Sequence, residues 1–315
     1  MPSTLAAPPE PPTRANPAQR LRTEMAGVRL SFTWLGVRKT LSPEQKSRAA
    51  ETFGAADEYV TASKKLLDTK HPAFKQVTAV RHRLVAAWKS RSLPFPEPGI
   101  RLIRRDDIES LDEQFQTLRV QLVEAVDELS SVYDELLTTA RRQLGTLFRE
   151  TDYPTSFVGM FDAAWDYPSC EPPSYLRALS PELYEQECQR VATRFEEAVR
   201  LAEEAFTTEF GELVFHLVDR LSGQDDGKPK IFRDSAVDNL REFFERFRHL
   251  NIGSNEELDQ LVTDAQGLLR GVQPRRLREN EGLRSRLAEQ LKQVGSALDD
   301  LLIERPRRQI LRTPK

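Results

Sequence analysis

A heptad repeat of apolar residues constrains this chain more than any other feature. From Ile108 to Leu136, apolar residues follow alternating steps of three and four for four heptads. They are Ile108, Leu111, Phe115, Leu118, Leu122, Ala125, Leu129, Val132 and Leu136. An α-helix with such a seam buries it against another helix. The seam therefore predicts a long helix, extending to about Phe148, within a helical hairpin or bundle.

A second long apolar stripe supplies a candidate partner for this helix. Ser180, Pro181 and Glu182 form a typical helix start, and the stripe then continues to Leu221. Its residues are Tyr184, Cys188, Val191, Phe195, Val199, Ala202, Phe206, Phe210, Leu213, Leu217 and Leu221. Two helices of matched length, joined by the segment of about 30 residues between them, favour an antiparallel pair. The predicted fold class is all-α, an elongated helical bundle with a long antiparallel coiled-coil-like hairpin. An interface between two copies of the chain suits the seam equally well.

Composition and local signals predict five consecutive regions. The first residues are rich in Pro and Ala, which favours disorder. They also lack the apolar stretch of a secretion signal. The regions are a disordered Pro-rich leader at 1–24, an N-terminal helical region at 25–100, the long hairpin at 101–222 with an aromatic tip at 152–179, a C-terminal helical region at 230–304, and a basic tail at 305–315.

Shorter signals divide the N-terminal region. The alternation of apolar residues from Val28 to Val37 is typical of a strand. Ser42 and Gln45 form a capping box that opens a helix expected to reach about Leu67. Pro72 begins the next helix, to about Ser90, and the prolines of residues 92–99 predict an extended connector.

Charge and cysteine content exclude some classes of protein. The formal net charge is −3, which excludes a global basic field of the kind that coats nucleic acid. Cys170 and Cys188 lie 18 residues apart without a metal-binding pattern, which favours reduced thiols in a cytoplasmic protein. No segment has the roughly 18 to 20 continuous apolar residues of a membrane-spanning helix, so no membrane association is expected.

The sequence contains no recognisable catalytic or metal-binding motif. It lacks His-Glu-x-x-His, a phosphate-binding glycine loop, Gly-x-Ser-x-Gly and a dinucleotide fingerprint. Two pairs with helical spacing, Glu212 with His216 and Glu245 with His249, are interpreted as ion pairs on helix surfaces. We therefore expect no cofactor and no metal, and we favour a non-enzymatic protein.

The aromatic-rich segment 152–179 is a candidate interaction site. Its candidate contact residues are Phe157, Phe161, Trp165, Tyr167 and Tyr175. Pro154 is expected to open a short helix that stacks Phe157, Phe161 and Trp165 on one face. Aromatic residues at the end of a helical rod form either a local core or exposed anchors for a partner, and the first is favoured.

Arginines in the last third of the chain are candidates for binding anions or nucleic acid, because the guanidinium group suits phosphate oxygens. The candidates are Arg233, Arg275, Arg276, Arg278, Arg305, Arg307 and Arg308. Glutamates lie among them at 279, 281 and 304, so a solvated mixed-charge face is the preferred interpretation. Asp234 beside Arg233 is likewise interpreted first as a helix cap.

One short string resembles a known family. The pattern Trp-x-Gly-x-x-Lys-x-Leu, formed by Trp34, Gly36, Lys39 and Leu41, is similar to the opening of an uncharacterised helical family of bacteria and phages, known as a domain of unknown function. The resemblance implies a phage or mobile-element protein that works in a multi-protein assembly, with an AAA ATPase as a candidate partner. It transfers no functional residue.

Together these features predict a helical scaffold or interaction protein that binds protein partners and is able to self-associate. Two alternatives remain open. One is a nucleic-acid-binding accessory factor that uses the C-terminal arginines, and the other is a helical enzyme or effector whose site forms no motif.

Overall fold

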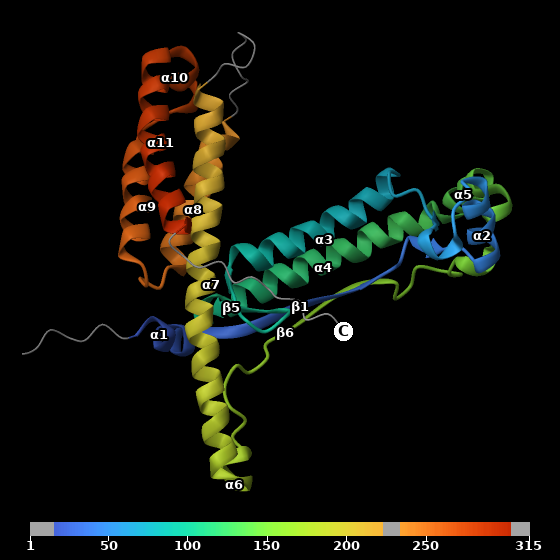
Figure 1. Ribbon diagram of the computed structural model, residues 1–315, viewed down its shortest axis with the longest axis horizontal. Helices are drawn as coiled ribbons and strands as arrows, with labels where there is room; N and C mark the ends of the chain where they lie inside the picture. Colours follow the sequence, from blue (N-terminus) through green and yellow to red (C-terminus); the bar gives the residue numbers. More distant parts are fainter. Residues whose placement is uncertain (1–15, 223–233, 304–315) are drawn as a thin grey trace, which may run out of the picture. The chain divides into compact units, whose positions relative to one another are not determined.

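The computed structural model describes residues 16–222 and 234–303. The helices are α1 (Pro17–Glu24), α2 (Pro43–Thr52), α3 (Pro72–Ser90), α4 (Ile108–Ser131), α5 (Tyr133–Leu144), α6 (Leu176–Leu179), α7 (Pro181–Ser222), α8 (Ser235–Leu250), α9 (Glu256–Leu269), α10 (Pro274–Glu279) and α11 (Glu281–Ile303). The strands are β1 (Met25–Trp34), β2 (Arg38–Thr40), β3 (Ser63–Lys65), β4 (Ser92–Pro94), β5 (Ile100–Arg104) and β6 (Phe161–Asp166). Figure 1 shows these elements along the chain.

The strands correct the prediction of an all-α fold. One sheet has four strands in the order β4-β5-β1-β6, and β2 and β3 form a separate pair. The pairs β1 with β6, β4 with β5 and β2 with β3 are antiparallel. The alternation in β1 indicated a strand, but its partner β6 follows four α-helices later in the chain. Because strand pairing of this kind is non-local, the sequence did not show a sheet, and the fold is a mixture of helices and strands.

The chain divides into two compact units, each built from separate parts of the sequence. The first unit comprises Met1–Gly27, Arg91–Arg105 and Pro168–Lys315, and the second comprises Val28–Ser90 and Asp106–Tyr167. Each unit is described by itself below.

The first unit is organised around the 42-residue helix α7. Its buried stripe packs against α11, α8 and α1 (Figure 1). Phe210 is fully buried there and stacks on Phe243 of α8, with ring centroids 5.1 Å apart. The helix predicted from 180 to 221 is therefore present with the predicted length.

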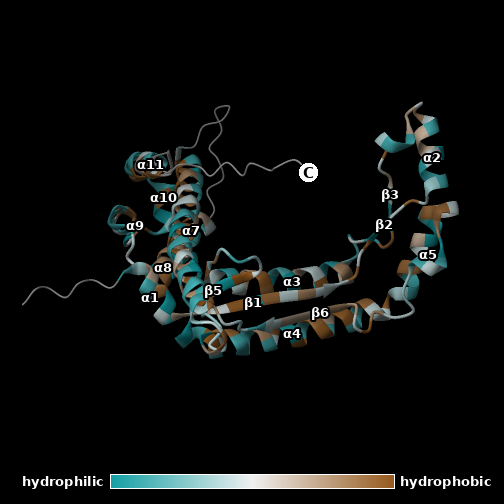
Figure 2. Ribbon diagram, turned by 60° about the horizontal axis from the view of Figure 1, so that its bottom comes forward, coloured by the Kyte–Doolittle hydropathy of each residue, from teal (hydrophilic) through white to brown (hydrophobic). Residues whose placement is uncertain are grey.

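The second unit is a helical hairpin packed on paired strands. Helices α3 and α4 pack against each other, and β6 lies along α4 (Figure 2). In the β1–β6 pair, Trp34 is opposite Phe161 and Leu30 is opposite Trp165. The inward-facing apolar residues of these strands are buried or half-buried, whereas Arg29 and Asp166 form an exposed ion pair of 2.5 Å.

The heptad seam is buried as predicted, but its predicted partner is wrong. Leu111, Phe115, Leu118, Leu122, Ala125 and Leu129 are all buried. They pack against α3 in the second unit, whereas α7 packs in the first. A heptad seam indicates that a second helix packs against it, but it does not identify that helix. Helix α3 offers a matching apolar stripe that includes Val77, Val80 and Leu84.

The N-terminal prediction needs two corrections. Residues 17–24 of the predicted disordered leader form α1, because Asn16 caps the helix and Leu21 is buried against the core that includes α7. The capping box of Ser42 and Gln45 is confirmed, but the helix it opens ends at Thr52 rather than near residue 67.

The long helix predicted from 108 to about 148 is also interrupted. Val132 leaves the helical conformation, with φ −105° and ψ 11°, and divides the helix into α4 and α5. Helix α5 then ends at Gly145, whose φ of 51° suits glycine.

Candidate interaction surface

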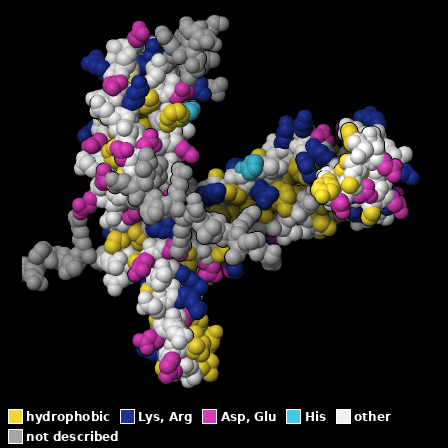
Figure 3. Space-filling view, in the orientation of Figure 1, with side chains coloured by type: hydrophobic (Ala, Val, Ile, Leu, Met, Phe, Trp, Pro, Cys, Tyr) yellow, Lys and Arg dark blue, Asp and Glu magenta, His cyan; other side chains and the backbone are white. Residues whose placement is uncertain are grey.

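Three large apolar side chains are exposed where α6 meets the beginning of α7. The exposed fractions are 64% for Tyr175, 75% for Leu179 and 53% for Leu183. Helix α6 packs against α7, and Figure 3 shows hydrophobic side chains gathered at this end of α7. We call Tyr175, Leu179 and Leu183 the α6–α7 patch. Adjacent exposed apolar residues of this size are typical of protein contact sites.

Local sequence fixes the position of this patch. Ser180 is extended, with φ −156° and ψ 110°, so it separates α6 from α7. Its hydroxyl oxygen accepts a hydrogen bond from the Leu183 backbone N–H at 3.3 Å and donates one to Glu182 at 2.9 Å. Pro181 is the first residue of α7. The Ser180 cap thus stabilises the N-terminus of α7 and holds Leu183 on its first turn.

The charged residues beside the patch are mainly acidic. Hydrogen bonds from its own backbone N–H and from Ser180 lower the pKa of Glu182, so this carboxylate stays ionised at neutral pH. Glu185 is also exposed on the next turn. The Arg177 guanidinium lies over the Tyr184 ring, 5.4 Å from its centroid. An apolar centre with acidic neighbours favours a partner surface with apolar and basic side chains.

The sequence identified Tyr175 but missed the two leucines. Leu179 and Leu183 lie outside the apolar stripe of α7 and are four residues apart across a helix start. The sequence signal that could have identified them is the position of two large apolar residues outside the buried stripe.

The other predicted aromatic residues form part of the second unit. Phe157 and Phe161 are buried, and Phe161 meets Trp34 edge to face with centroids 5.0 Å apart. The predicted helix from Pro154 to Trp165 is wrong, since Phe161–Asp166 is strand β6. Packing on β1 places Phe161 and Trp165 on the same side of a strand, because side chains alternate along it.

Trp165 and Tyr167 are tied to α4 through one carboxylate. Trp165 donates from Nε1 to Asp112 Oδ1 at 2.6 Å, and the Tyr167 hydroxyl donates to the same oxygen at 3.3 Å. Partial burial, together with the charge of Asp112 and this hydrogen bond, raises the pKa of Tyr167 to about 12. These contacts give both aromatic residues a structural role. Tyr175, in the first unit, is the member of the predicted set that lies in the α6–α7 patch.

The predicted arginine site is represented only in part. Arg278 pairs with Asp234, and Arg275 pairs with Glu279 at 2.9 Å. Arg276 is exposed in α10. The remaining candidates, Arg233, Arg305, Arg307 and Arg308, lie outside the described residues. The two ion pairs follow the interpretation of a mixed-charge surface.

Residues of the Trp-x-Gly-x-x-Lys string have structural contacts. The Arg81 guanidinium lies 4.7 Å from the Trp34 ring centroid, and Trp34 packs on Phe161. The Lys39 ammonium pairs with Asp152 at 2.6 Å. This string therefore joins β1 and β2 to the rest of the second unit.

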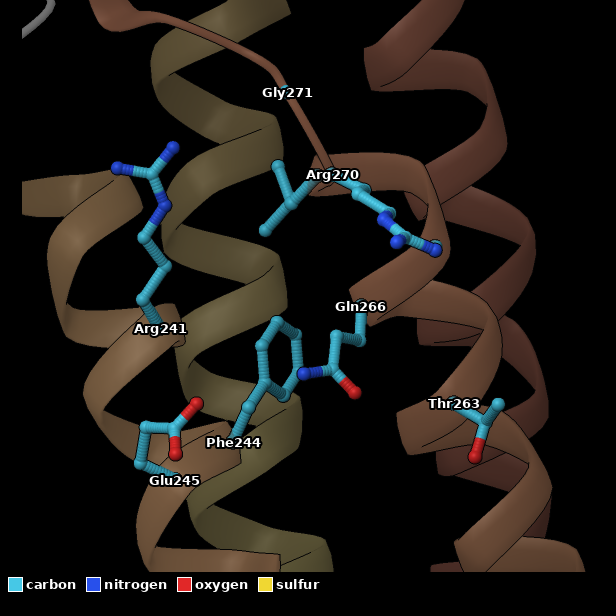
Figure 4. Close-up of a pocket in the computed structure, with 9 residues that line it drawn as sticks. Arg241, Phe244, Glu245, Thr263, Gln266, Arg270 and Gly271 are labelled. Atoms are coloured by element: carbon cyan, nitrogen blue, oxygen red, sulfur yellow. The ribbon is translucent and has the colours of Figure 1, made fainter.

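A cavity of about 560 Å³ lies between α8 and α9 (Figure 4). Arg241 and the Glu245 carboxylate line it on the α8 side, and Arg270 lines it at the end of α9. Arg241 donates to the Val272 carbonyl at 2.6 Å and pairs with Asp238 at 3.3 Å. Arg241 thus fixes the position of the segment after α9. Because both arginine and glutamate side chains line the cavity, its charge does not favour one class of ligand.

Within residues 16–222 and 234–303, no group of three or more His, Cys, Asp or Glu side chains is placed to hold a metal ion. Cys170 and Cys188 are free thiols. None of the helices in the described parts of the chain has both the length and the apolar character needed to cross a membrane.

No protein-family model, curated protein or solved structure gives a significant match to the chain.

Proposed function

We propose that this chain is a non-enzymatic interaction protein that docks on a protein partner through the α6–α7 patch. The observation that carries the proposal is the exposure of Tyr175, Leu179 and Leu183 at one end of a capped, rigid helix. Burying such side chains in a complex contributes about 25 cal/mol per Å² of apolar area. Because the patch is held in place before binding, little ordering cost opposes association.

The nature of the partner follows from the surroundings of the patch. Glu182 and Glu185 favour a partner with basic residues around an apolar centre. The resemblance of the Trp34–Leu41 string suggests a multi-protein assembly of a phage or mobile element, in which an AAA ATPase is the first partner to test.

Affinity capture from the native cell tests the proposal. Intact tagged chain is compared with the variant Tyr175→Ala/Leu179→Ala/Leu183→Ala, and bound proteins are identified by mass spectrometry. The matched control is Phe53→Ala/Tyr59→Ala/Phe215→Ala, which removes three exposed aromatic side chains elsewhere. We expect a specific partner to bind the intact chain and the control and to be lost from the patch variant.

Site-specific cross-linking provides a second readout that does not depend on affinity. A photoreactive amino acid at position 179 is expected to capture that same partner, whereas one at position 215 is not. Equal binding of all partners to the patch variant would contradict the proposal. So would recovery of nucleic acid alone, released by moderate salt from every form of the protein.

A further inference from the structure

Helices α3 and α4 have opposite charge but do not neutralise each other. Helix α3 contains four Lys and Arg residues and no Asp or Glu, whereas α4 contains six Asp and Glu residues and one Arg. Across the described parts of the chain, no ion pair joins the two helices, and Arg119 of α4 pairs instead with Asp162 of β6. Figure 3 shows Lys, Arg and His side chains gathered over α3.

The exposed face of α3 has a heptad pattern of its own. The outer seam of α3 follows steps of four and three and consists of Lys75, Ala79, His82, Ala86 and Lys89, all of them exposed. It lies on the side of the helix opposite the buried residues Val77, Val80 and Leu84. The two alanines between the larger polar residues allow another helix to approach closely.

The exposed face of α4 has the complementary pattern. The outer seam of α4 consists of Glu113, Gln116, Val120, Val123 and Asp127, all of them exposed, in steps of three and four. Val120 is 59% exposed and Val123 is 55% exposed, and their spacing of three residues places both on the same face of α4. This seam also lies opposite the buried stripe of its helix.

The two outer seams match when the helices are antiparallel. Lys75 then faces Asp127 and Lys89 faces Glu113, so each end of the contact joins opposite charges. Between them Ala79 faces Val123, His82 faces Val120 and Ala86 faces Gln116. The small residue Ala79 thus opposes Val123, the His82 ring covers Val120, and the charged pairs fix one register. We propose that a second copy of this chain packs the outer seam of its α4 against the outer seam of α3.

The geometry also points to assemblies larger than a dimer. The buried sides of α3 and α4 pack on each other and on the strands, so the two outer seams are separate exposed surfaces. One copy therefore uses its α3 seam on one neighbour and its α4 seam on another, which is a head-to-tail contact. Inside one chain, Arg83 reaches Gln121 at 2.8 Å, so residue 82 is level with about residue 122. Pairing residue 82 with residue 120 of the next copy displaces successive copies by only about 3 Å along the helix axis.

This inference goes beyond the proposed function, since it concerns residues of the second unit and not the α6–α7 patch. Sedimentation velocity of the full chain between about 1 and about 100 µM tests it. We expect the sedimentation coefficient to rise with concentration past that of a dimer. High salt is expected to shift this rise to higher concentration, because exposed ion pairs are screened.

Charge-reversed variants test the register. The variant Lys75→Glu/Lys89→Glu makes both seams acidic, and Glu113→Lys/Asp127→Lys makes both seams basic. Each is expected to associate at least about tenfold more weakly than the unchanged chain. An equimolar mixture of the two is expected to associate again, since each acidic seam then meets a basic one. The control Arg248→Glu/Lys292→Glu makes the same change in net charge as Lys75→Glu/Lys89→Glu, on exposed residues of the first unit, and is expected to associate normally.

Several results would overturn the proposal. They are a chain that stays monomeric up to about 100 µM, a mixture of the two reversed variants that stays dissociated, and a control that dissociates as much as they do. A monomeric chain that binds an oligonucleotide through Lys75 and Lys89 would overturn it too. Circular dichroism shows whether each variant is folded, and loss of association at Val120→Asp provides a second test that leaves the charged pairs intact.

Discussion

Lys64 and Asp152 form an ion pair of 2.5 Å in which both side chains are almost fully buried, at 4% and 3% exposure. The Lys64 ammonium also donates to the Leu147 carbonyl at 2.6 Å. Without Lys64, the buried Asp152 carboxylate keeps only Lys39, whose side chain is 54% exposed, and loses its buried cation. We expect Lys64→Met to lower the free energy of unfolding by about 3 kcal/mol in urea titrations. Lys39→Met, which removes the more exposed cation from the same carboxylate, is expected to cost less than about 1 kcal/mol.

Asp152 also predicts a loss of stability in acid. Hydrogen bonds from Lys39 and Lys64 hold the pKa of Asp152 below its ordinary value of 3.8. A carboxyl whose pKa is lower in the folded state stabilises the fold above the unfolded-state pKa, and this contribution is lost as the pH falls through the folded-state pKa. Asp152→Asn is expected to be less stable than the unchanged chain at pH 7 and to lose less further stability below about pH 4. Parallel curves for the two proteins across that range would contradict this.

Tyr167 predicts a matching effect in alkali. Its pKa is about 12 in the folded chain against an ordinary value of 10.0. Because the folded state holds the phenol proton more tightly, the stabilising contribution is present below pH 10 and is lost as the pH rises toward 12. Tyr167→Phe is expected to show a smaller decline in stability over this interval, measured by thermal unfolding at a series of pH values.

Position 27 in the first unit has no room for a side chain larger than that of glycine. A Cβ atom at this position would lie 2.6 Å from the Pro168 carbonyl oxygen and 2.9 Å from Cys170 Sγ. Gly27→Ala is expected to destabilise the chain by about 1 to 3 kcal/mol, because backbone must shift to admit the methyl group. Gly36→Ala, where a Cβ meets nothing within 4 Å, is the control and is expected to be nearly neutral.

Two phenylalanines on α7 predict opposite outcomes. Phe210 is fully buried and stacks on Phe243, whereas Phe215 is 74% exposed. Phe210→Ala is expected to lower the free energy of unfolding by about 3 to 5 kcal/mol. Phe215→Ala is expected to change it by less than about 0.5 kcal/mol. Similar losses in chemical denaturation would show that the described packing of α7 is wrong.

Periodicity predicted the helices better than it predicted their neighbours. The seam of Leu111 to Leu129 is buried as expected, and α7 has the expected length. The pairing of α4 with α3 was missed because apolar stripes on different helices are chemically alike. The segment containing Phe161 and Trp165 suits a helix by its steps of four and a strand by its steps of two, and contact with β1 selects the strand.

The candidate site was predictable only in part. Tyr175 stood out as an aromatic residue in a distinctive segment, but Trp165 and Tyr167 in the same segment are fixed to Asp112. Burial of an aromatic side chain depends on partners such as Asp112 that are distant in sequence. Leu179 and Leu183 carried a weaker signal, because single leucines outside an apolar stripe are common on protein surfaces.

The interleaved arrangement of the two units has a consequence for synthesis of the chain. All residues of the second unit, Val28–Ser90 and Asp106–Tyr167, leave the ribosome before α7 begins at Pro181. The hairpin and its strands are therefore able to fold while the first unit still lacks its central helix. We expect ribosome-bound chains arrested after about residue 210 to resist proteolysis in the second unit, whereas α1 and β4, which pack on α7, are expected to remain sensitive to proteolysis.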